Sequence, residues 1–134
     1  MNEREFIERF EACTLPEDAF HHGDHVRLAY LYLRDLPPLD ALARFTTGLK
    51  RFATSLGKPD RYHETITWAY LLLIHERLQR APADNFESFA RANPDLLAWR
   101  PSVLDAYYQP GTLGSDLARR AFVMPDGGRG TVTG

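Results

Sequence analysis

The sequence predicts an all-α protein: an up-and-down helical bundle of four main helices followed by shorter C-terminal helices. Two observations predict this class. Apolar residues recur at three- and four-residue spacing through long segments, which is the pattern of a buried helical face, and no segment shows the alternation of a strand. The length of 134 residues, with 44% hydrophobic and 25% charged residues, is that of one globular domain. We predict a single helical domain over residues 1–124 and a disordered, glycine-rich tail over residues 125–134.

The first two helices are delimited by residues that favour helix ends. Asn2 is a good N-cap for a helix that runs to about Cys13, with its apolar residues on one face. A second helix is predicted over residues 22–35, because the pair Pro37 and Pro38 stops it. Pro38 also suits the first turn of the helix that follows.

The third helix carries an inner stripe that includes Phe45, Leu49 and Phe52, and Gly57 is expected to cap its C-terminus. The fourth helix, residues 62–80, is apolar nearly all round in its middle, which is typical of a central helix. Shorter helical segments are predicted at residues 85–92, 101–108 and 115–123.

Composition excludes several functional classes. A net charge of -2 and dispersed basic residues give no electrostatic surface for nucleic acid. No apolar run approaches the roughly 18 residues of a membrane span, and the charged N-terminus does not resemble a signal peptide. A cytoplasmic protein is expected, without membrane or nucleic-acid partners and with a homo-oligomer as an open alternative. The lone Cys13 agrees with this, since it cannot form an internal disulfide.

Two histidine-containing segments are the best candidates for a functional site. In an up-and-down bundle the second and fourth helices point the same way, so their N-termini lie at the same end. His22 and His25 belong to the first turn of one helix, and Tyr62, His63 and Glu64 to the first turn of the other. We therefore expect the two segments to meet at one polar pocket.

The spacing of the histidines divides them. His22 and His25 are three residues apart and share one helical face, whose next residue, Ala29, is small enough to leave room. His21 points about 100° away from His22 and is expected at the surface.

The first interpretation of this pocket is a metal site with His22, His25 and His63 as ligands. Glu64 or Asp24 would be a fourth ligand or a base. Neutral imidazoles suit zinc, iron or nickel, and three protein ligands leave an open position for a reactive water, as in a metal-dependent hydrolase or lyase. His-x-x-His spacing is common by chance, so this pattern has low specificity.

The second interpretation is acid–base chemistry without a metal, as in a lyase or isomerase. Two helix N-termini attract a carboxylate or phosphate and favour neutral imidazole. His25 and His63 would exchange protons, Tyr62 would donate a hydrogen bond, and Arg27 or Arg61 would bind a small organic anion. The candidate catalytic residues are therefore His25, His63, Glu64 and Tyr62. The aromatic wall of the pocket is expected from Tyr30, Trp68 and Tyr70.

A third interpretation belongs to a different class of protein. The histidines would be ordinary caps, and the aromatic C-terminal part, from Trp99 to Phe122, would pack against a protein partner. A large exposed apolar patch there, with no cavity at the histidines, would favour this interaction module. Cys13 is not expected to be a nucleophile, because a thiol on an apolar face is unreactive.

Overall fold

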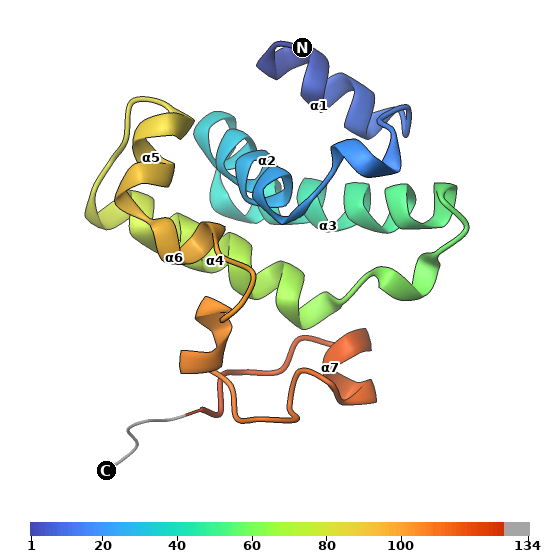
Figure 1. Cartoon of the computed structure of the whole chain (residues 1–134), viewed down its shortest axis with the longest axis vertical. Helices are drawn as coiled ribbons and strands as arrows, with labels where there is room; N and C mark the ends of the chain where they lie inside the picture. Colours follow the sequence, from blue (N-terminus) through green and yellow to red (C-terminus); the bar gives the residue numbers. More distant parts are fainter. Residues whose placement is uncertain (128–134) are drawn as a thin grey trace.

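The computed structural model describes residues 1–127, and in that range it consists of helices and loops without a strand (Figure 1). The predicted all-α class is confirmed. The α-helices of this range are α1 (Glu3–Glu11), α2 (His22–Asp35), α3 (Pro38–Ser55), α4 (Glu64–Arg80), α5 (Phe86–Ala92), α6 (Pro94–Leu97) and α7 (Asp116–Arg120). Three 3₁₀ turns join them: η1 (Glu17–Ala19), η2 (Pro59–Arg61) and η3 (Val103–Ala106).

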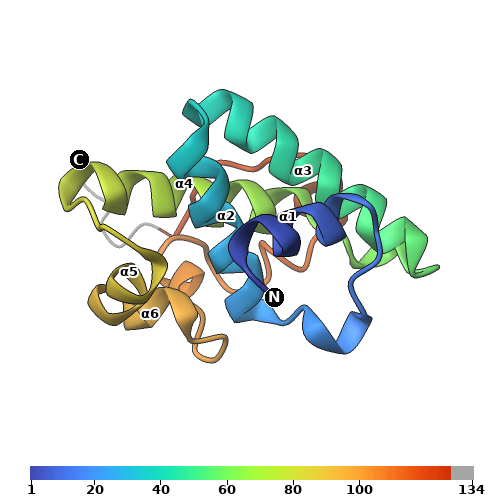
Figure 2. The same cartoon turned by 90° about the horizontal axis from the view of Figure 1, so that it is seen from above.

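The core is built where α2, α3 and α4 pack against one another. α2 is enclosed on several sides, since Val26, Leu28, Ala29 and Leu31 are at most 1% exposed. α1 packs on one side of this core, whereas α5 and α6 contact α2 on another. Figure 2 shows α2 running across α3 and α4 rather than alongside them. The simple up-and-down arrangement, on which the predicted meeting of helix ends depended, is therefore not confirmed.

The first and third helices end in the same way. Cys13 and Gly57 both adopt a left-handed backbone conformation, with φ of 59° and 72°. The amide after each turns back to a helical carbonyl: Thr14 N–H donates to Arg9, and Lys58 N–H donates to Ala53, both at 2.9 Å. This is the Schellman arrangement, which satisfies carbonyls at a helix end. The cap predicted at Gly57 is confirmed, whereas Cys13 lies beyond the end of α1.

Gly48 allows α1 to pack closely on α3. A Cβ atom at this position would lie 2.5 Å from Cε2 of Phe10, a fully buried residue of α1. Glycine in a helix interior costs about 1 kcal/mol relative to alanine. Close helix packing is the physical reason for its presence here.

The C-terminal part is fastened to α4 by a buried hydroxyl. Thr65 Oγ1 lies 2.7 Å from the carbonyl of Ala118 and 2.8 Å from that of Ala121, and it accepts a hydrogen bond from Val123 N–H at 3.1 Å. The carbonyl of Ala121 and the amide of Val123, both beyond Arg120, are thus hydrogen-bonded without further helical turns. α7 is therefore shorter than the helix predicted over residues 115–123.

Two other differences concern residues 94–127. The chain forms an additional short helix, α6, and the helix predicted over residues 101–108 is reduced to the 3₁₀ turn η3. The predicted tail is held in place at its start, because Asp126 accepts hydrogen bonds from Gln109 N–H and Thr112 Oγ1, and Gly127 N–H donates to Tyr107. Residues 125–127 are described as a segment hydrogen-bonded to residues 107–112. For residues 128–134 the prediction falls outside the described residues.

Candidate functional site

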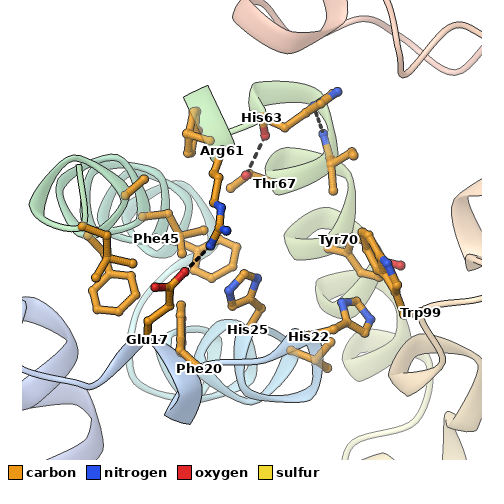
Figure 3. Close-up of a pocket in the computed structure, with 17 residues that line it drawn as sticks. Glu17, Phe20, His22, His25, Phe45, Arg61, His63, Thr67, Tyr70 and Trp99 are labelled. Carbon is orange, nitrogen blue, oxygen red and sulfur yellow. Dashed lines mark hydrogen bonds and ion pairs between the residues drawn. The ribbon is translucent and has the colours of Figure 1, made fainter. Parts of the chain in front are cut away.

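A cavity of about 260 Å³ lies between α2, α3 and α4, at the point where the two histidine segments face each other (Figure 3). Its wall is mostly apolar, formed by Phe20, Val26, Phe45, Leu49, Phe52, Ala53, Leu56 and Ile66. Its polar and amphipathic lining residues are Glu17, His22, His25, Arg61, Tyr62, His63, Thr67, Tyr70 and Trp99. The prediction that residues from both segments line one pocket is therefore correct.

His25, a residue of intermediate exposure, directs its imidazole into this cavity. Its ring lies against Phe20, with 4.2 Å between ring centroids. Figure 3 shows no hydrogen bond between its ring nitrogens and the other residues that line the cavity. Burial lowers the pKa of His25 to about 4, and the neighbouring charge of His22 acts in the same direction. The imidazole is therefore neutral at physiological pH.

His22 lines the same cavity beside Tyr70 and Trp99. Its Nε2 donates to the carbonyl of Leu96 at 2.9 Å, which leaves Nδ1 as the acceptor of the neutral ring. The rings of Tyr70 and Trp99 each lie 5.0 Å from it, between centroids. Burial lowers the pKa of His22 as well. The sequence predicted neutral histidines from the field of the helix ends, whereas burial is the main cause.

His63 is the N-cap of α4 and is not available as a ligand or base. Its Nδ1 accepts a hydrogen bond from Ile66 N–H at 3.1 Å, and its Nε2 donates to the carbonyl of Leu113 at 2.6 Å. Both ring nitrogens are thus occupied by backbone groups. In Figure 3 the ring points away from His25. The structure supports the capping role and not the predicted acid–base or metal-ligand role.

Tyr62 and Glu64 form a hydrogen bond to each other. The Tyr62 hydroxyl donates to Glu64 Oε1 at 2.5 Å, and Lys50 Nζ lies 3.9 Å from the same carboxylate oxygen. Burial, and then the hydrogen bond to Glu64, raises the pKa of Tyr62. Tyr62 lines the cavity with a hydroxyl that already has an acceptor, and Glu64 is not among the lining residues. The geometry therefore gives neither residue the predicted catalytic contact.

The crossing of α2 over α4 explains why the histidines do not converge. His22 packs against Tyr70, which is seven residues, or about 10 Å of helix, beyond His63. Among residues 1–127, no three side chains of His, Cys, Asp or Glu are grouped so that they could hold a metal ion. The predicted donor set of His22, His25 and His63, with Asp24 or Glu64, is not assembled here.

One predicted arginine reaches the cavity and the other does not. Arg61, from η2, lines it and forms an ion pair with Glu17 of η1, whose carboxylate also pairs with Lys58 at 2.8 Å. These two cations lower the pKa of Glu17. Arg27 instead lies over the ring of Phe6, 4.8 Å from its centroid. Arg61 is therefore the cation at this site.

The aromatic wall differs from the predicted one in two of three residues. Tyr70 lines the cavity, but Tyr30 packs against Phe86 and Phe89, and Trp68 stacks on Phe122 with 5.0 Å between ring centroids. Phe20, Phe45, Phe52, Tyr62 and Trp99 supply the other aromatic rings besides the histidines. The stripe of α3 was recognisable in the sequence as an inner face. Nothing in the local pattern indicated that Glu17 or Trp99 would reach the cavity.

A second hollow lies over the C-terminal part. It is an apolar groove lined by Leu72, Tyr107, Phe122, Met124 and neighbouring residues of α4 and the C-terminal loops. Met124 is 72% exposed. An interaction module was expected to have an exposed apolar patch in this region and no cavity at the histidines. The groove is such an apolar surface. The cavity at His25 is present.

Comparison of the chain with models of known families, with curated proteins and with solved structures finds no match. In the part of the chain from residue 1 to residue 127, no helix has the length and apolar character needed to cross a bilayer. Function is therefore argued from the cavity itself.

Proposed function

We propose that this protein binds a small organic molecule in the cavity, with the imidazole of His25 as its polar contact. The observation that carries the proposal is a neutral imidazole directed into a mostly apolar cavity without a hydrogen bond to the surrounding wall. His25 is of intermediate exposure and its ring nitrogens are not enclosed, so a ligand competes with water for them, and a hydrogen bond between neutral groups then contributes a net gain of about 0.5–1.5 kcal/mol. A ligand that bonds to His25 and also covers the apolar wall gains from both contacts.

The wall and the volume define the kind of ligand. Phe20, Phe45 and Phe52 offer aromatic surface for a hydrocarbon portion, and neutral His25 both donates and accepts. The cavity volume of about 260 Å³ is below the roughly 300 Å³ at which sites for drug-sized ligands begin. The ligand class that fits is a single ring or short chain carrying one or two polar groups.

Acid–base turnover of the bound molecule is a second candidate, because the cavity contains two imidazoles. His22 has Nδ1 available as an acceptor, and His25 lies on the same face of α2, three residues further on. A pKa of about 4 makes His25 a weak base in the empty cavity. Turnover would therefore require a ligand whose own charge raises that pKa.

The test is a fragment screen by ¹H–¹⁵N NMR with small aromatic alcohols, amides and acids. We expect bound fragments to shift the Trp99 indole and the α2 amides near His25. A His25→Leu variant keeps similar side-chain bulk and removes both nitrogens, and its affinities should fall about 2- to 10-fold. His21→Gln, at an exposed position of the same helix end, is the matched control. Shifts confined to other surfaces, or equal affinities in wild type and His25→Leu, would contradict the proposal.

Turnover has its own readout. A bound fragment with an acidic C–H bond should exchange that hydrogen with D₂O in the wild type and not in His25→Leu. Binding without such exchange would leave the protein as a binder and remove the second candidate.

A further inference from the structure

We propose that the Arg61 end of the cavity is a carboxylate-binding site, in which Glu17 is the internal occupant and a ligand carboxylate takes its place. This inference rests on the proposed binding function and names its ligand class: small aromatic or aliphatic monocarboxylates.

Arg61 has the position and the free donors for this role. Figure 3 shows its side chain extending into the cavity toward Glu17 and the neighbourhood of His25. Among the lining residues, its bond is the one from Nη1 to Glu17 Oε2. A guanidinium presents five N–H donors in a planar fork, and two parallel bonds to one carboxylate are its strongest arrangement. The fork is therefore only partly used by Glu17.

Replacing Glu17 by a ligand carboxylate at Arg61 should cost little free energy. Its side chain is 42% exposed at the rim, and Lys58 Nζ lies 2.8 Å from the same oxygen that binds Arg61. When a ligand carboxylate takes Arg61, the carboxylate of Glu17 keeps Lys58 and gains water. Neither carboxylate is left buried without a cation, which is the costly outcome. A neutral ligand offers Arg61 no such replacement.

The rest of the cavity suits the remainder of such a ligand. The carboxylate at Arg61 places the hydrocarbon portion along Phe45 and Phe52, which also line the cavity. His25 is then available to a second polar group or to the carboxylate itself. The incoming anion brings the site to charge balance, because Arg61 and Lys58 then face two carboxylates, that of Glu17 and that of the ligand.

A matched pair of probes tests the inference: 3-phenylpropionate and 3-phenylpropanamide, which differ in charge but hardly in shape. Their affinities are measured by calorimetry at low salt for wild type, Glu17→Gln and Arg61→Gln. Because the Arg61 side chain is 60% exposed, we expect the acid to bind wild type about 2- to 5-fold more tightly than the amide at low salt. Glu17→Gln should strengthen acid binding severalfold and leave amide binding unchanged, and Arg61→Gln should abolish the preference for the acid.

The control is Arg51→Gln, an exposed arginine of α3 that bonds to the carbonyl of Glu11 and does not line the cavity. It should bind both probes as the wild type does. Equal affinities of acid and amide in the wild type, or acid binding that Glu17→Gln does not change, would overturn the carboxylate site while leaving the binding function in place. Failure of both probes to bind would count against the binding function itself, and the inference would fall with it.

Discussion

The pH dependence of folding stability tests the environment of His25. In the unfolded chain its imidazole has the ordinary pKa of 6.5, whereas in the folded protein burial lowers this pKa to about 4, with the charge of His22 adding to the effect and that of Asp24 opposing it. Between these two values the unfolded chain binds a proton that the folded protein excludes. Stability therefore falls as the pH falls from 6.5 to 4, and above pH 6.5 this contribution no longer changes.

The magnitude follows from the two pKa values. Each pKa unit corresponds to about 1.4 kcal/mol, so complete titration through the window costs about 3 kcal/mol. Between pH 7 and pH 5 the same linkage relation gives a loss of about 2 kcal/mol. Because a small domain is stable by only about 5–15 kcal/mol, this loss is readily measured.

Urea unfolding followed by circular dichroism at pH 7 and pH 5 is the assay. We expect the loss of unfolding free energy to be about 2 kcal/mol smaller in His25→Gln, which does not titrate, than in the wild type. Part of the remaining loss comes from His22, whose pKa is also lowered by burial. His21→Gln should follow the wild type. Losses that agree within about 0.5 kcal/mol in wild type and His25→Gln would refute the buried, neutral imidazole.

Substitutions at three further sites, Gly48, Thr65 and His63, test the packing and the caps. Gly48→Ala should destabilise the protein by about 1–2 kcal/mol in urea unfolding, because its Cβ would lie 2.5 Å from Phe10. Phe10→Leu in the same chain should recover part of this loss. A stabilising Gly48→Ala would contradict the close packing. Thr65→Val should cost about 2–3 kcal/mol and speed hydrogen exchange at the Val123 amide, whereas unchanged exchange would refute the fastening role of the hydroxyl. His63→Ala should cost about 1 kcal/mol of unfolding free energy, and His63→Asn less, because asparagine also caps helices. The affinity for the probes should be retained in His63→Asn. A loss of that affinity would support a direct role of His63 in binding.

Helix boundaries were largely predictable because they depend on local chemistry. α2 begins and ends at the predicted residues. Its end is determined locally, because Pro37 and Pro38 cannot continue the helix. Asn2 caps α1 as expected, its Oδ1 accepting from Glu5 N–H at 2.8 Å. In each case the deciding interaction lies within a few residues of the helix end.

The role of His63 shows why the site was harder to predict. The sequence placed this residue in the first turn of a helix, as a candidate ligand or base or, in the alternative interpretation, as an ordinary cap. In the structure it comes one residue before the first helical residue, with φ of -133° and ψ of 113°, and its ring turns back onto Ile66. A shift of one or two residues in a boundary thus changes a candidate ligand into a cap. The crossing of α2 over α4 could not be predicted for another reason. It depends on contacts between helices that are far apart in the sequence.

The bond from His22 to Leu96 has a consequence for the order in which the cavity is assembled. It joins residues 74 positions apart, whereas the helices that form the cavity walls follow one another closely in the chain. Closing so long a loop carries a larger entropic cost than closing a short one. We expect the segment that carries Leu96 and Trp99 to dock after α2, α3 and α4 have packed, and to detach first in local opening. Its departure would uncover His22 and the buried face of Leu96 while the contacts among α2, α3 and α4 remain, so the last contact to form also marks a route by which a ligand enters.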